Sequence, residues 1–282
     1  MSGMFMRFPE GKAKALTLSY DDGVEQDIRL MEIMDKHGLK GTFNLNSGRF
    51  APEGTVYAAG DCHRRMTESQ VTEAYMNSGH EVAVHGLTHP FLEQLPENMA
   101  MWELLKDSEN LENQFNTIVR GMAYPFGTYN DTVVECLKKA GIVYGRTVIS
   151  SHSFDIPEDW LRLEATCHHN DPELMKLADR FITESPGWTP WLFYLWGHSY
   201  EFEADDNWDV IEKFAAFTGE HEDVWYATNI QIHDYVQAYR RLEFSADGRQ
   251  VYNPTAVKLY FEIGEKDRSK YCIMPGERLN CT

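Results

Sequence analysis

The sequence has few cysteines and few basic residues, and both shortages narrow the classes of protein that it can encode. The 282 residues include five cysteines, an odd number without CxxC spacing, so we expect reduced thiols, with neither a disulfide framework nor a cysteine zinc motif. Lysine and arginine total 26 against 44 aspartates and glutamates, a formal charge of −18. Such an acidic surface repels phosphate backbones and anionic lipids, so we expect neither nucleic acid nor a membrane as partner.

Long apolar segments are also absent. Residues 1–11 contain no apolar stretch long enough for a secretory leader, and the longest apolar run, residues 188–197, is too short to cross a bilayer. These absences predict a cytoplasmic protein. The composition is that of an ordinary globular chain, with 43% hydrophobic residues, which excludes a disordered one.

Strand patterns alternate with helix patterns along the chain. The expected strands are residues 13–20, 41–46, 81–85, 118–124, 142–148, 161–167, 191–196, 224–230 and 256–263, and the expected helices are residues 28–34, 67–79, 98–115, 131–140, 172–183, 208–217 and 233–241. This alternation predicts parallel βαβ units. Because no glycine-rich nucleotide fingerprint is present, it favours a distorted, TIM-like (β/α) barrel of the α/β class over a doubly wound sheet.

We expect one domain over residues 1–282. Residues 14–200 would form the barrel core that carries the motifs, and residues 201–282 the remaining barrel elements and a C-terminal extension. The acidic stretch 201–209 reads as a solvated loop followed by the start of a helix.

Potential metal ligands follow two of the expected strands. Asp21 and Asp22 end the first strand, and adjacent carboxylates repel each other unless a cation lies near, although Asp-Asp-Gly also makes a good turn. His85 and His89 follow the third strand at a spacing that lets both imidazoles reach one metal, although paired surface histidines are common. Because both pairs lie at carboxyl ends of parallel strands, where barrels build their sites, the combination predicts a metal centre.

Two further segments could complete such a site. His198 follows a very apolar strand, where it could serve as a general acid or simply pack in the core. Arg120 could pair with a buried carboxylate, and the turn at residues 124–127 could present backbone N–H groups to an oxyanion. A surface arginine and an ordinary turn are the alternative.

Other clusters are weaker candidates. Cys167, His168 and His169 could bind a metal by composition, or the histidines could support another site residue. The aromatic residues could form a platform for sugar rings, but alternate aromatics on a strand are more often core; they are Trp188, Trp191, Trp196 and Tyr200.

The four motif segments, in this order, resemble the conserved motifs of the polysaccharide deacetylases of carbohydrate esterase family 4, the NodB homology domain, over residues 14–200. The resemblance implies a distorted, incomplete (β/α) barrel and one divalent metal, commonly zinc, held by an aspartate and two histidines. By position it implies that Asp21 is the catalytic base and that Asp22, His85 and His89 hold the metal.

The resemblance also assigns the surroundings of the metal. It implies that Arg120 orients the base, that the Phe126 backbone N–H faces the oxyanion, and that His198 is the general acid. The side chains expected to line the acetyl and substrate pocket are Tyr124, Trp160, Leu195 and Trp196. The chain departs from the family pattern at Tyr20, where phenylalanine is usual, and in the fourth motif, where Asp155 and Asp159 are one residue too far apart.

The function implied is removal of N- or O-linked acetyl groups from an acetylated carbohydrate or a small acylated substrate. The metal would be Zn²⁺, with Co²⁺, Ni²⁺ and Mn²⁺ left open, because availability counts as much as affinity. One alternative is hydrolysis of another non-peptide C–N bond, in a cyclic amide or formamide, on the same scaffold. The other is a sugar-binding barrel without catalysis.

Overall fold

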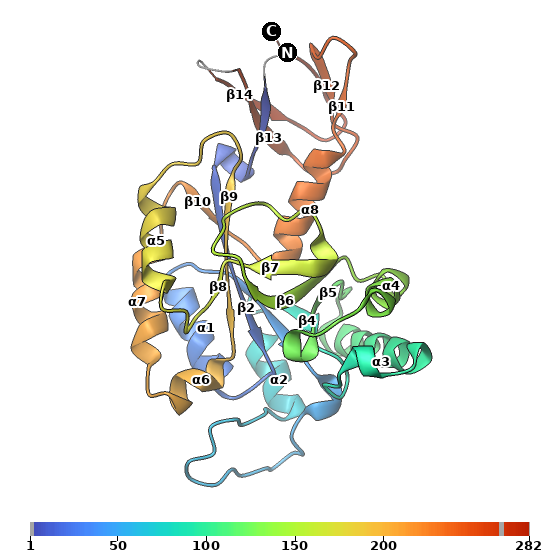
Figure 1. The fold of residues 1–282 in the computed structure, drawn as a ribbon, viewed down its shortest axis with the longest axis vertical. Coiled ribbons are helices and arrows are strands. Elements are labelled where there is room, and N and C mark those ends of the chain that lie inside the picture. The colour runs from blue at the N-terminus through green and yellow to red at the C-terminus, as the bar shows by residue number, and fades with distance from the viewer. Residues whose placement is uncertain (1–2, 265–267, 282) are drawn as a thin grey trace.

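A computed structural model of the protein describes residues 3–264 and 268–281 and contains a nine-stranded parallel sheet with helices packed around it (Figure 1). Eight strands follow the order β7-β6-β5-β4-β3-β2-β9-β8, and β10 pairs with the first half of β2. The strands are β2 (Lys14–Asp21), β3 (Gly41–Leu45), β4 (Glu81–Val84), β5 (Gly121–Ala123), β6 (Tyr144–Ser150), β7 (Leu163–Ala165), β8 (Cys167–His168), β9 (Trp191–Gly197) and β10 (Val224–Tyr226). This arrangement confirms the distorted (β/α) barrel.

Most helices occupy the predicted connections between strands. They are α1 (Gln26–Lys36), α2 (Glu68–Tyr75), α3 (Glu97–Phe115), α4 (Asp131–Ala140), α5 (Leu174–Thr183), α6 (Ser199–Ala204), α7 (Trp208–Thr218) and α8 (Asn229–Arg240). The capping box read from Thr67 and Gln70 starts α2, and Gly141, with φ 81°, ends α4 in the left-handed conformation that glycine adopts without penalty.

The structure differs from the expected elements near residue 228. The strand expected over residues 224–230 ends at Tyr226, because Thr228 and Gln231 form a second capping box that starts α8 four residues earlier than predicted. The strand expected over residues 161–167 is divided into β7 and β8. Helix α6 was not predicted, since its short acidic sequence lacks an extended apolar period.

Two apolar clusters lie on opposite faces of the sheet. Alternate residues of β9 show the division: Phe193 and Leu195 pack in the layer between the sheet and the outer helices, whereas Tyr194 and Trp196 face the barrel interior. The amino-terminal end of α8 closes that interior at the end opposite the carboxyl ends of the strands. Asn229 there accepts a hydrogen bond from Thr17 Oγ1 (2.9 Å) and donates one to the Tyr194 hydroxyl (2.7 Å).

The C-terminal extension forms two small antiparallel sheets beyond α8, at the end of the molecule where both termini lie (Figure 1). Their strands are β1 (Met4–Arg7), β13 (Leu259–Ile263) and β14 (Ser269–Ile273) in one, and β11 (Glu243–Phe244), β12 (Gln250–Tyr252) and β15 (Arg278–Asn280) in the other. Tyr235 of α8 fastens the first sheet by donating to Arg7 O (2.7 Å) and accepting from Tyr260 N (3.0 Å). Within the described ranges, no helix is both long and apolar enough to traverse a bilayer.

Removal of one aromatic ring from the apolar layer between the sheet and the outer helices should cause a large loss of stability. Phe193 is fully buried and contacts Phe154, Phe181 and Phe214 at centroid distances of 5.4–5.6 Å. We expect Phe193→Ala to lower the free energy of unfolding by about 3–5 kcal/mol. Ile118→Ala, at a side chain that is 79% exposed, should change it by less than about 0.5 kcal/mol. Denaturant unfolding followed by tryptophan fluorescence measures both; equal midpoints for the two variants would contradict the packing described.

Candidate metal centre and active site

The paired aspartates emerge at the carboxyl end of β2, a strand that is buried along its whole length. Asp21 and Asp22 are 2% and 6% exposed, so neither is a solvated turn residue. Asp22 has φ 86°, a conformation that non-glycine residues rarely adopt, and its N–H donates to Asn44 O of β3 (3.0 Å). Unusual backbone at a buried carboxylate is a feature of functional sites.

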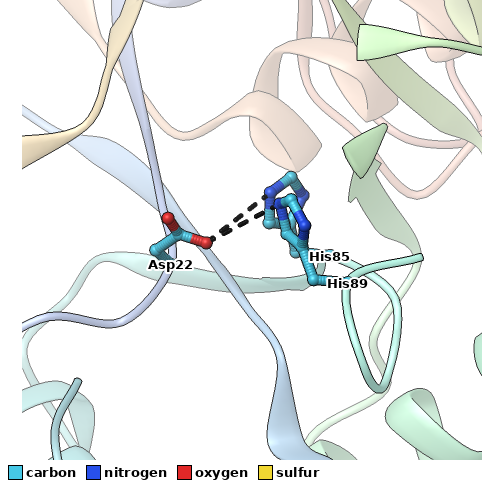
Figure 2. A group of neighbouring side chains, drawn as sticks. All are labelled: Asp22, His85 and His89. Atoms are coloured by element: carbon cyan, nitrogen blue, oxygen red, sulfur yellow. Dashed lines mark ion pairs between the residues drawn. The ribbon is translucent and has the colours of Figure 1, made fainter. Parts of the chain in front are cut away.

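Asp22 and the two motif histidines converge on one point. Asp22 Oδ1 lies 4.0 Å from His85 Nε2 and 3.9 Å from His89 Nε2, and Figure 2 shows the carboxylate facing both imidazoles. Their three ligand atoms lie within 4.8 Å of one another. A carboxylate with two imidazoles suits a divalent metal and leaves coordination positions open for a water or substrate.

The state of the histidines fits metal binding. His85 Nδ1 donates to Ala123 O of β5 (2.7 Å), which leaves the lone pair on Nε2, the atom that faces Asp22. Burial lowers the pKa of His85, and it lowers the pKa of His89 to about 4. Both imidazoles are therefore neutral at neutral pH, as a metal ligand requires.

The predicted turn after β5 adjoins this centre. Phe126, with φ 59°, places its ring edge-on to His89 (4.4 Å between centroids) and stacks it on Phe91 (3.9 Å). Tyr124 does not line the site. Its side chain is buried and its hydroxyl donates to Leu161 O (2.7 Å), so that the phenol supports the turn from behind.

Asp21 is paired with Arg146 of β6, which sequence reasoning missed. Arg146 is fully buried, and its Nη2 donates to both carboxylate oxygens of Asp21. Asn44 Nδ2 adds a hydrogen bond to Asp21 Oδ1 (2.9 Å). The only available sequence signal was an arginine in the interior of a predicted strand, where an ion partner is needed.

The prediction that Arg120 orients Asp21 is wrong. Arg120 precedes β5 and so lies at the amino end of that strand, opposite the edge that carries Asp21; its guanidinium pairs with Asp234 of α8. Trp160 likewise lies before the amino end of its strand, β7, and packs edge-on to His233 of α8 (5.1 Å between centroids). The prediction that Trp160 lines the substrate pocket is therefore also wrong.

The β9 residues of the predicted pocket divide between the two faces. Leu195 is fully buried in the layer beneath the outer helices, so the prediction that it lines the acetyl pocket is wrong. Trp196, one residue on, faces the interior and lies over the Arg146 guanidinium at 4.5 Å. A strand reverses its side-chain direction at each residue, and a shift of one position therefore exchanges pocket for core.

His198 lies across Asp21 from the metal ligands. Its Nε2 is 3.9 Å from Asp21 Oδ2, and its Nδ1 forms a hydrogen bond with Glu201 Oε1 (3.2 Å). Glu201 lies in the acidic stretch that the sequence analysis set aside as solvated. The missed signal is its position three residues after His198, which becomes one helical face once α6 forms.

His168 and His169 surround the other side of Glu201. The Nε2 atom of each lies 3.1 Å from Glu201 Oε2. The ligand atoms of His168, His198 and Glu201 are close enough to suggest a second metal group. However, Asn170 N–H donates to His168 Nδ1 (3.1 Å), so the proton of neutral His168 is on Nε2, facing Glu201. This favours the alternative in which these histidines support Glu201.

The contacts among these histidines and Glu201 shift the pKa values of Glu201 and His198. Burial by itself would raise the pKa of Glu201, but contacts with His168, His169 and His198 outweigh it and hold that pKa well below its usual range. Burial would likewise lower the pKa of His198, yet the hydrogen bond with Glu201 and the nearby Asp21 carboxylate raise it. Glu201 and Asp21 therefore both favour the protonated form of His198.

The chain is similar to known proteins in both sequence and fold. Residues 9–145, just under half of the chain, match the family model described as polysaccharide deacetylase. A provisionally assigned polysaccharide deacetylase from Mycobacterium smegmatis has the same fold, with a TM-score of 0.59 and 18% identity over 83% of this chain and 93% of that one.

Two other solved structures are more distant. Streptococcus pyogenes deacetylase PplD, in complex with acetate, gives a TM-score of 0.45 and 23% identity over 52% of this chain and 61% of that one. A CE4 family pseudoenzyme from Bacillus anthracis gives 0.47 and 21% over 81% and 67%. No curated protein matches the chain.

The barrel thus brings Asp21 and His198 close to a three-residue group that could hold a metal ion. The family match supports the resemblance drawn from the motifs: residues 9–145 match the polysaccharide deacetylase family model.

The two arginines predict contrasting stabilities. Arg146→Met would leave the Asp21 carboxylate buried without its counter-charge, which should lower the free energy of unfolding by about 3–5 kcal/mol. Arg120→Met breaks a pair whose side chains are 36% and 43% exposed, and should cost less than about 1 kcal/mol. Chemical denaturation at pH 7 measures both. A larger loss for Arg120→Met would show that the two pairs have been assigned wrongly.

Proposed function

We propose that the protein removes acetyl groups, N- or O-linked, from an acetylated saccharide with the help of one zinc-type divalent metal on Asp22, His85 and His89. One observation carries the proposal: a single oxygen, Asp21 Oδ2, lies 3.7 Å from Nε2 of His85 in the candidate metal group and 3.9 Å from His198 Nε2. A base thus stands between a metal centre and an acid, the arrangement that acyl hydrolysis needs.

Asp21 is suited to the role of general base. Burial alone would raise its pKa, but the charge of Arg146, with His85 and His198, lowers it. The carboxylate is therefore ionised at neutral pH and can take a proton from a water held beside it. Arg146 and Asn44 fix its orientation, so little reorganisation is needed as the proton moves.

His198 is suited to the role of general acid. Its raised pKa favours the protonated form, and with Nδ1 held by Glu201 the Nε2 proton points toward Asp21, where it can pass to a departing amine or alkoxide. When bound, the metal supplies a Lewis acid that polarises the acyl carbonyl and acidifies a water. The Phe126 backbone N–H is the chain's own candidate donor to the developing oxyanion.

A saccharide substrate is supported by the surroundings. The partly exposed Tyr200 lies 5.3 Å from His198 between ring centroids, and an aromatic ring in this position can pack against a sugar ring. The formal charge of −18 favours a neutral or cationic ligand over an anionic one. The match of residues 9–145 to the polysaccharide deacetylase family model supports the acetyl group.

The test is acetate release from a panel of acetylated saccharides and acetylated small amines. The zinc-loaded protein should release acetate, chelation should abolish release, and Asp21→Asn should lower kcat/KM by about 10²–10⁴-fold because the general base is lost. Glu32→Gln, on the exposed side of α1, is the matched control and should leave the rate unchanged.

Each other outcome has a distinct meaning. Release that survives both chelation and Asp21→Asn would contradict the mechanism. No release from any substrate, with one metal still bound, would point to another C–N hydrolase. Saccharide binding that Asp21→Asn leaves intact, without turnover, would indicate a sugar-binding barrel.

Glu201 should set the basic limb of the pH profile. His198 must carry its proton to act, so activity is lost as pH rises through its raised pKa. Glu201→Gln removes the carboxylate charge that helps to raise this pKa, and the loss should occur at lower pH than in the unaltered protein. The measurement is kcat/KM against pH, with Glu212→Gln of α7 as the control. A basic limb that stays in place would argue against His198 as the acid.

A further inference from the structure

A loop far from the motifs folds back onto the metal-binding carboxylate. The segment between residues 50 and 66 joins β3 to α2 and forms the long loop next to α2 in Figure 1. At its end, Arg65 Nη2 donates to Asp22 Oδ1 (2.8 Å), and Arg65 Nη1 donates to the Asp22 backbone O (2.8 Å) and to Asn46 Oδ1 (2.9 Å). One guanidinium therefore holds both the backbone and the side chain of Asp22.

His63 engages the other carboxylate oxygen. Its Nε2 lies 2.9 Å from Asp22 Oδ2, and its ring packs edge-on to Tyr200 (4.6 Å between centroids). With Oδ1 held by Arg65 and Oδ2 by His63, the carboxylate cannot rotate freely. The oxygen that faces His85 and His89 is Oδ1, so the arrangement presents that oxygen for single-atom coordination.

The loop itself is anchored between these two residues. Arg64 forms a two-point pair with Glu203 of α6 (2.6 and 2.8 Å) and a further bond with Glu25 (2.7 Å). Glu203 also accepts from Gln26 Nε2 (2.8 Å). These bonds connect the loop to the start of α1 and to the helix that follows His198, so both sides of the site support it.

We propose that His63 and Arg65 form a clamp that holds Asp22 in its metal-binding orientation and thereby raises the affinity for the metal. The inference rests on the proposed metal function. Arg65 has two opposing effects on metal binding. Its positive charge weakens the electrostatic attraction between the Asp22 carboxylate and a cation, whereas its hydrogen bonds hold the Asp22 backbone at φ 86°, a conformation that would otherwise relax. Because Arg65 holds Asp22 at two points, the orientation effect dominates.

The experiment measures zinc affinity directly, by competition with a chromophoric chelator at one pH and ionic strength. Residues that orient a metal ligand typically contribute 10–100-fold in affinity, so His63→Ala and Arg65→Ala should each weaken zinc binding by about that factor. Arg65→Lys keeps the charge but loses the two-point hold, and should also bind zinc more weakly. Arg49→Ala, an exposed arginine near the start of the same loop, removes equal charge and should bind normally.

Folding is checked by the melting temperature of each metal-free variant. His63 is 42% exposed at its side chain, so its truncation should leave the melting temperature unchanged, and it tests the clamp even where Arg65→Ala unfolds the chain. Weaker zinc binding by His63→Ala at an unchanged melting temperature would support the clamp.

The failure of this inference is distinguishable from failure of the function. If the unaltered protein binds no zinc, the proposed metal centre is wrong. If it binds one zinc, and His63→Ala and Arg65→Ala bind it as tightly as Arg49→Ala or more tightly, the centre stands and the clamp is wrong.

Discussion

The ion pair between Asp21 and Arg146 is the constraint around which the rest of the site is arranged. Both side chains are buried in the barrel, where an unpaired charge would be expensive, so neither is tolerable without the other. The pair crosses the interior from β2 to β6 and is covered by Trp196 of β9. It keeps a carboxylate ionised in a place where burial would otherwise neutralise it.

The site divides into two halves on either side of Asp21. The metal half consists of Asp22 from β2 and the histidines that follow β4, with the ligand state set by a backbone carbonyl of β5. The proton half consists of His198 and Glu201, backed by the histidines of β8 and the turn after it. The metal half draws on β2, β4 and β5 and the proton half on β8 and β9, and the Asp21 carboxylate approaches a histidine of each half.

What could be predicted from the sequence was local. Asp22, His85 and His89 were identified because strand ends of a parallel sheet share one edge, and the spacing along the chain is enough to place them. The partner of Asp21 was not predictable in the same way. Arg120 and Arg146 both lie within predicted strands, and only the register of β5 against β6 places Arg146 at the functional edge.

Other errors have equally physical causes. Leu195 was assigned to the pocket, although alternation along β9 turns it outward and Trp196 inward. Glu201 looked like part of a solvated acidic run, because the inward turn of α6 depends on tertiary contacts with His168 and His169 that no short window contains. Polar residues that face a barrel interior have the composition of surface residues, and composition alone misplaces them.

The pairing of β1 with β13 has a consequence for the order in which the molecule is assembled. Met6 lies opposite Phe261, so β1 gains its partner strand only after the barrel between the two strands has been synthesised. All residues of the metal and proton halves lie between positions 21 and 201 and are synthesised before that closure. The sheet of β1, β13 and β14 can therefore close only after every residue of the site has been synthesised.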